Sequence, residues 1–327
     1  MKKTLYRLIS LCTFLFVISS ALFFFFFVQF TAPGPLDNKV NLVIPKGLTL
    51  TQIAKFLEKE KVISSHFVFK TGVHIFQKSE QLRAGEFTFD THISPREVMN
   101  VLLNSPHVQR KITFIEGMTV KQIINILEST EGLTGDVPTH PPQEGFLFPD
   151  TYYFTYGDSK KSIIQRMSNK MSESLDDLWQ KKPKEFPLSS KSDVIILASL
   201  IEKETSLQEE KPRVASVFFN RLKQKMRLQS DPTIIYALSD GLGKIDRKLY
   251  RKDWEFSSPY NTYKNAGLPP TAIANPGYDS ILAVFYPADT DDLYFVANGQ
   301  GGHAFAETLE EHNRNVLNLR KIQSESP

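Results

Sequence analysis

The chain has 327 residues, which is enough for a membrane segment and one large or two modest folded domains. Hydrophobic residues make up 41% and charged residues 23%, so the composition is that of a globular protein and not of a disordered one. A formal net charge of +3, without a basic stripe interleaved with aromatic residues, argues against nucleic acid as a partner. The only cysteine, Cys12, excludes internal disulfides, cysteine-ligated zinc and thiol catalysis, and we expect neither a metal nor a cofactor.

The first predicted element is a membrane-spanning helix over residues 8–30. No charged residue occurs there, and about 23 residues of helix extend roughly 34 Å, enough to cross a bilayer core. Basic residues precede the stretch, whereas the first charge after it is Asp37. The positive-inside rule then predicts residues 1–7 in the cytoplasm and the remainder in the periplasm, on a single-pass protein of the inner membrane. A cleaved signal peptide is disfavoured, because the stretch is long and no small-x-small motif follows it.

After a predicted spacer of residues 31–38, two segments of the region 39–160 repeat. Ile44–Glu58 and Phe114–Glu128 share glycine, threonine, glutamine, isoleucine, leucine and glutamate in register. Each copy predicts a strand, a glycine turn, a threonine N-cap and an amphipathic helix. The pattern resembles LysM-type modules, small βα units found on proteins that contact chitin-like or peptidoglycan sugars. Sugar-binding modules and packing platforms without sugar affinity both remain open.

Beyond the repeats, the pattern becomes more helical. Residues 161–186 predict a helix followed by a lysine-rich linker, and residues 187–321 predict a catalytic domain. In that domain, Asp193 can cap one helix, a second begins near Pro212, and a glycine-rich turn joins two short strands. The soluble part is therefore predicted to be α+β, with a mainly helical catalytic domain.

Two glutamates close the most apolar predicted helix. A carboxyl group at the end of such a helix is expected to be partly buried, and burial disfavours the charged form. A protonated carboxyl is what a general acid for glycosidic cleavage requires. Spacing alone does not separate Glu202 from Glu204, since both have apolar residues three or four positions before them. The alternative is a structural ion pair of Glu202 with Lys203 or Arg213.

The sequence around these glutamates carries a family resemblance. The run Ile196–Glu204 looks like the signature of the endolytic murein transglycosylases, the YceG-like (MltG) family, and the family's essential glutamate falls on Glu202. Ser230 stands where threonine is expected. Further motifs follow in the family's order: Val214–Leu222, Met226–Thr233, Tyr260–Tyr263, Gly267–Pro270, Ile273–Gly277, Leu293–Ala297 and Gly302–Phe305.

The resemblance implies a lysozyme-like catalytic domain and a lytic transglycosylase, which cuts the bond after N-acetylmuramic acid in peptidoglycan. One carboxyl group would act as acid and then as base on the sugar's C6 hydroxyl, leaving a 1,6-anhydro end. Expected partners are glycan strands, membrane lipid and peptidoglycan synthases, with a role in terminating nascent strands. The alternatives are a non-catalytic peptidoglycan-binding scaffold and a hydrolytic muramidase that uses Asp231 or Glu204 as a second carboxylate. Candidate glycan contacts, each with a structural turn or cap as the alternative, are Gln229, Asp231, Tyr260 and Asn261.

Overall fold

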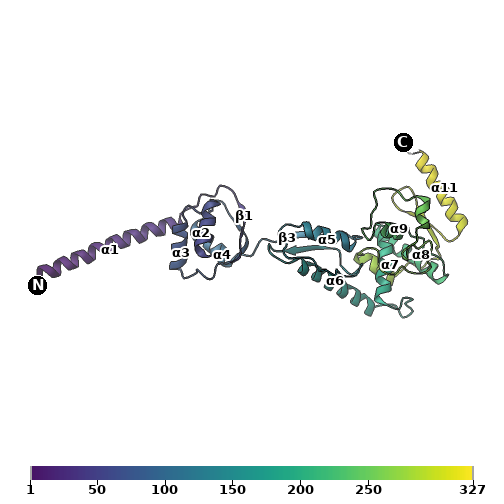
Figure 1. Ribbon diagram of the computed structural model, residues 1–327, viewed down its shortest axis with the longest axis horizontal. Coiled ribbons are helices and arrows are strands. Elements are labelled where there is room, and N and C mark those ends of the chain that lie inside the picture. The colour runs from purple at the N-terminus through teal and green to yellow at the C-terminus, as the bar shows by residue number, and fades with distance from the viewer. Residues whose placement is uncertain (1, 326–327) are drawn as a thin grey trace. The chain divides into compact units, whose positions relative to one another are not determined.

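A computed structural model describes residues 2–325 (Figure 1). Helices and short two-stranded sheets alternate, so the chain is α+β as predicted. Its contacts divide it into two compact units. Unit 1 comprises the residues up to Arg110 together with 153–157, and unit 2 comprises residues 111–152 together with the rest of the chain from Asp158. The division falls inside the region 39–160, which the sequence had suggested as one domain, and it separates the two repeats.

Unit 1 is built from one long helix, three short helices and an antiparallel pair of strands. Strands β1 and β2 are antiparallel, with Val40 opposite Phe89 and Ile44 opposite Gly85. The order between these strands is β-α-α-β. The elements are α1 (Lys2–Thr31), β1 (Val40–Ile44), α2 (Leu50–Lys59), α3 (His66–Ile75), β2 (Gly85–Phe89) and α4 (Pro95–Asn104).

The predicted membrane helix ends inside the core of unit 1. α1 is long and apolar enough to cross a membrane by length and composition. Its residue Phe30 is fully buried and packs against Gly72 of α3. The predicted spacer is also tied to this unit, because Gly34 N–H donates to His92 O and His92 N–H donates to Leu36 O. The helix and the folded unit are therefore joined without a free linker.

The predicted helix starts of the repeats are confirmed. Thr49 accepts from Gln52 N–H at the start of α2, and the Gln52 side chain accepts from Thr49 N–H in return. Thr119 and Gln122 form the same reciprocal pair at the start of α5 (Val120–Ser129). Such capping boxes satisfy backbone donors that a helix N-terminus otherwise leaves unpaired. The recurring Thr-x-x-Gln spacing is thus a local structural signal, which explains why it was readable in the sequence.

Unit 2 consists mainly of helices, with short strand pairs at two places. β3 pairs with β4, and β5 pairs with β6 in an antiparallel hairpin across the predicted glycine-rich turn. β3 (Arg110–Thr113) and β4 (Thr151–Phe154) each have residues in both units. Besides α5 and two short 3₁₀ segments (Gln208–Glu210 and Arg251–Glu255), the other elements of unit 2 are α6 (Lys160–Gln180), α7 (Lys191–Glu204), α8 (Lys211–Lys223), α9 (Asp231–Leu238), α10 (Tyr278–Phe285), β5 (Tyr294–Ala297), β6 (His303–Ala306) and α11 (Leu309–Glu325).

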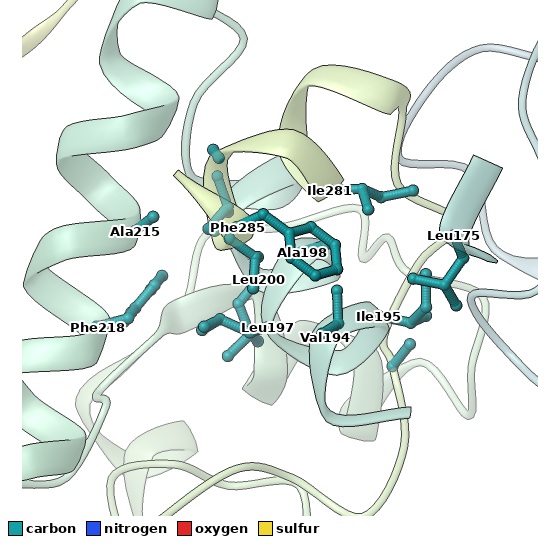
Figure 2. Close-up of a cluster of buried hydrophobic side chains, with 14 of the residues drawn as sticks. Leu175, Val194, Ile195, Leu197, Ala198, Leu200, Ala215, Phe218, Ile281 and Phe285 are labelled. Atoms are coloured by element: carbon teal, nitrogen blue, oxygen red, sulfur yellow. The ribbon is translucent and has the colours of Figure 1, made fainter. Parts of the chain in front are cut away.

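Helix α7 is the central element of the core of unit 2. Every residue from Val194 to Ile201 is buried, so side chains on all sides of this helix are covered. Figure 2 shows Phe218 of α8 and Phe285 of α10 turned toward α7. The prediction that Asp193 caps this helix is corrected, because the N-cap is Ser190. Asp193 is the third helical residue and completes a capping box with Ser190. A helix packed on all sides is a rigid support for the residues at its end.

Candidate active site

The two glutamates at the end of α7 lie in separate polar clusters. Successive residues of an α-helix are about 100° apart around its axis, so residues two apart point to nearly opposite sides. Glu202 contacts α8 and α10, whereas Glu204 contacts the loop that precedes α9. The structure thus separates two candidates that sequence spacing left equivalent.

Three donor groups surround one carboxylate oxygen of Glu202. Its Oε2 accepts from Gly277 N–H at 2.9 Å and from Ser280 Oγ–H at 2.7 Å. The ammonium of Lys211 lies 3.3 Å from the same oxygen, and only 6% of the Glu202 side chain and 2% of the Lys211 side chain are exposed. Gly277 is the N-cap of α10 and has no side chain of its own to accept these donors. Glu202 therefore caps α10 and neutralises a buried lysine.

This environment differs from the predicted one for Glu202. The side chain is buried, as expected at the end of an apolar helix. Its ionic partner is Lys211, and not Lys203 or Arg213 as the structural alternative had it, and two hydrogen-bond donors also contact the carboxylate. Glu202 therefore lies in a polar cluster between the end of α7, the start of α8 and the start of α10.

Glu116 joins the Glu202 cluster and was missed in the sequence. Its Oε2 lies 3.7 Å from Lys211 Nζ, and about half of its side chain is exposed. Desolvation and the neighbouring Glu202 charge raise the pKa of Glu116 above its ordinary value. One signal was available: the second repeat has Glu116 where the first has Lys46. That charge reversal marks the copy that packs beside the α7 glutamate.

Glu204 has the environment that a general acid requires. Burial raises the pKa of Glu204 to about 7, with a hydrogen bond from Ser230 opposing the shift and the Asp231 charge adding to it. Ser230 Oγ–H donates to Glu204 Oε1, and no ammonium forms an ion pair with Glu204 among residues 2–325. At neutral pH a substantial fraction of this carboxyl group is therefore protonated.

An aromatic and carboxylate cluster adjoins Glu204. Asp231 Oδ1 accepts from Trp254 Nε1–H at 2.9 Å and from Tyr263 O–H at 2.7 Å. The ring centroids of Trp254 and Tyr263 are 5.9 Å apart. Aromatic faces beside hydrogen-bonding groups are typical of surfaces that bind small organic ligands. Asp231, predicted as a glycan contact, is thus placed beside Glu204.

The other three predicted glycan contacts differ in how far their side chains are exposed. Gln229 is exposed, in a left-handed backbone conformation with φ of 49°. The hydroxyl oxygen of Tyr260 forms a hydrogen bond of 2.8 Å with Thr271 Oγ1, and Tyr260 lines a pocket together with Tyr236. Asn261 is fully buried, and its amide donates to Trp254 O and Phe256 O. The prediction for Asn261 is therefore corrected to a structural role in holding the loop of Trp254.

A fourth glutamate, Glu144, is largely buried in a cluster with Val120, Asn275 and Tyr236. It accepts from Val120 N–H at 2.9 Å and from the Asn275 amide at 3.1 Å. Burial raises the pKa of Glu144 to about 7. These contacts tie the start of α5 to the loop before α10. Within residues 2–325 the structure holds no group of three or more His, Cys, Asp or Glu residues arranged to bind a metal ion.

Comparison with known proteins decides the family. The model of the YceG-like family matches residues 42–318, which is most of the chain. The chain belongs to the YceG-like family. A curated relative from Bacillus subtilis (strain 168), named endolytic murein transglycosylase, is 34% identical over 86% of each chain. One of the same name from Streptococcus pneumoniae (serotype 2, strain D39) is 27% identical over 94% of this chain and 64% of its own length.

A solved YceG-like structure supports the same fold. The crystal structure of a yceG-like protein from Listeria monocytogenes is 32% identical in sequence, with a TM-score of 0.51. The match covers 85% of this chain and 99% of that one. The YceG-like match includes residues of both units and all three glutamate clusters described above.

Proposed function

We propose that this protein is a membrane-anchored, endolytic lytic transglycosylase that cleaves peptidoglycan glycan strands. The family, and the name endolytic murein transglycosylase carried by its curated relatives, support an enzyme acting on peptidoglycan. The observation that carries the proposal is the environment of Glu204. Burial raises the pKa of Glu204 to about 7, and its carboxyl group adjoins the cluster of Asp231, Trp254 and Tyr263.

In the mechanism that we propose Glu204 is the acid, and Glu202, the residue that matches the family's essential glutamate, is the alternative for the same role. Its protonated carboxyl group donates to the glycosidic oxygen between N-acetylmuramic acid and N-acetylglucosamine as that bond breaks. The resulting carboxylate then accepts the proton of the muramic acid C6 hydroxyl, whose oxygen closes on C1 to form a 1,6-anhydro ring. One carboxyl group thus serves both steps, and its proton is returned at the end. The membership of the YceG-like family is the reason for proposing a lysozyme-like catalytic domain.

A hydrolytic muramidase is the second candidate, and one observation favours it. Asp231 adjoins Glu204, and both of its described hydrogen bonds are to Oδ1. Most glycosidases that add water use two neighbouring carboxyl groups. The water-free route is preferred because the curated relatives are named transglycosylases.

The products of digestion distinguish the two reactions and the scaffold alternative. Purified sacculi digested by the full-length protein in ¹⁸O water should yield 1,6-anhydro-N-acetylmuramic acid ends without label, as measured by mass spectrometry. Reducing ends that carry ¹⁸O would mean hydrolysis through Asp231. Intact sacculi would mean a binding protein, and cuts restricted to strand ends would remove only the endolytic part of the proposal.

We also propose that α1 anchors the protein in the membrane with its N-terminus in the cytoplasm. The apolar length of α1 and the basic residues before it support this topology. A reporter fused after Pro327 should be active only outside the cytoplasm, and the protein should resist carbonate extraction from membranes. Release of a shortened, extractable form would show that the segment is a cleaved signal.

The repeats support a further part of the proposal. The β-α-α-β order of unit 1 is compatible with a LysM-like, sugar-contacting module. The second repeat instead contributes Glu116 to the cluster around Lys211 in unit 2.

Anchoring would keep the enzyme near newly made strands by raising its effective concentration there. Termination of nascent strands beside peptidoglycan synthases is the role that we propose on that basis.

A further inference from the structure

The end of α1 is fixed against a particular face of unit 1. The ring of Phe30 stacks on Phe26 at 5.9 Å between centroids and on Phe76 at 5.8 Å. Phe76 is the C-cap of α3, and α1 packs on both α3 and α4. The surface around Phe76 is therefore the part of unit 1 where the apolar helix enters.

Helix length places this surface at the edge of the bilayer, if α1 is the anchor proposed above. About 20 apolar helical residues span a hydrocarbon core of about 30 Å. Counted from Leu8, the first residue of the uncharged stretch, that length ends near Phe27. Phe27 is 42% exposed, whereas Phe30, less than one turn later, is fully buried in unit 1. The region between Phe26 and Phe30 then lies at the level of the lipid headgroups.

A basic pocket opens on the same face. Its volume is about 350 Å³, and it lies between the end of α3 and the α4 helix. Its lining includes two cations, Lys78 and Arg96, and no acidic side chain. Lys78 Nζ–H donates to Gln81, and neither cation forms an ion pair with any residue from 2 to 325. Asn100 and Asn104 add amide donors to the lining.

Exposed apolar side chains border this pocket. Phe76 is 41% exposed and lines it, while the preceding residue, Ile75, is 51% exposed. Leu103 adds an apolar wall. Cations and amides that could hold a phosphate, next to apolar side chains, match a ligand with an anionic head and an acyl tail. A soluble anion would not use the apolar part.

We propose that this pocket binds the headgroup of an anionic phospholipid in the outer leaflet, with Ile75 and Phe76 in contact with its acyl region. Lys78 and Arg96 would pair with the phosphate, and the amides of Asn100 and Asn104 would donate to the polar head. Each cation near an anionic surface contributes roughly a fivefold preference, so the pair predicts a selectivity of about 25-fold over a zwitterionic lipid.

The test uses the full-length protein in nanodiscs of phosphatidylcholine alone or with phosphatidylglycerol. Hydrogen exchange of residues 75–82 and 95–104 should be at least about threefold slower with phosphatidylglycerol, because a bound ligand stabilises the structure that it contacts. Failure of the chain to enter nanodiscs would instead refute the anchor, which is a different result.

Charge-reversal variants locate the effect. The double variant Lys78→Glu/Arg96→Glu should lose the protection by phosphatidylglycerol. The matched control Lys55→Glu/Lys59→Glu makes the same change of charge at exposed positions of α2 outside the pocket, and it should keep the protection. Equal exchange in the two lipids, or equal loss in both variants, would overturn the proposal. Protection that appears only when an acidic protein is added would assign the pocket to that partner instead.

Discussion

Replacing Glu204 by glutamine should lower the rate of glycan cleavage by about 10²–10⁴-fold, because the amide has the shape of the acid but cannot donate or accept the catalytic proton. Release of muropeptides from sacculi, corrected for the folded fraction, measures the effect. Glu202→Gln is the matched variant two residues away on the same helix. It should retain most of the cleavage per folded molecule, because Glu202 caps α10 and pairs with Lys211.

The pH profile gives an independent check on the same residue. The acid must be protonated to act, and burial raises the pKa of Glu204 to about 7, so kcat/KM should fall about tenfold per unit as the pH rises above that value. The hydrogen bond from Ser230 lowers the pKa of Glu204. Ser230→Ala should therefore move the descending limb to higher pH. Loss of cleavage in Glu202→Gln with full activity in Glu204→Gln would instead restore the sequence-based assignment.

Lys211→Met should cost about 3–5 kcal/mol of the free energy of unfolding of unit 2, because removing one partner of a buried ion pair leaves the other charge unpaired. Glu202 would keep only its bonds from Gly277 and Ser280 in a site where 6% of its side chain is exposed. Urea unfolding followed by tryptophan fluorescence measures this cost. Both tryptophans of the chain, Trp179 and Trp254, belong to unit 2.

A double variant separates charge from packing. Lys211→Met/Glu202→Gln removes both charges and keeps similar volumes, so it should recover a large part of the loss. Lys203, next to Glu202 on α7, has an ammonium that donates only to Gly117 O among the described residues. Lys203→Met is therefore the matched control and should change stability by less than about 1 kcal/mol. A cost as small for Lys211→Met would mean that the Glu202 cluster contributes little to the fold.

The sequence by itself determined the features that depend on neighbouring residues. The uncharged stretch predicted α1, and the Thr-x-x-Gln spacing predicted the capped helices of both repeats, which the structure confirms. Caps and helix periodicity arise from contacts three or four positions apart, so they are visible in the linear pattern. The order of motifs also identified the family, which the match over residues 42–318 confirms.

Only the tertiary structure decided what surrounds each functional side chain. Glu202 and Glu204 have equivalent apolar neighbours in sequence, but α8 brings Lys211 to the first and the loop before α9 brings Ser230 to the second. Glu116 reaches the Glu202 cluster from a repeat that ends more than 70 positions earlier. A carboxyl group's protonation depends on burial and on charges within a few ångströms. Those charges come from distant parts of the chain, so no local pattern of residues could show which glutamate lies beside Lys211 and which lies beside Ser230.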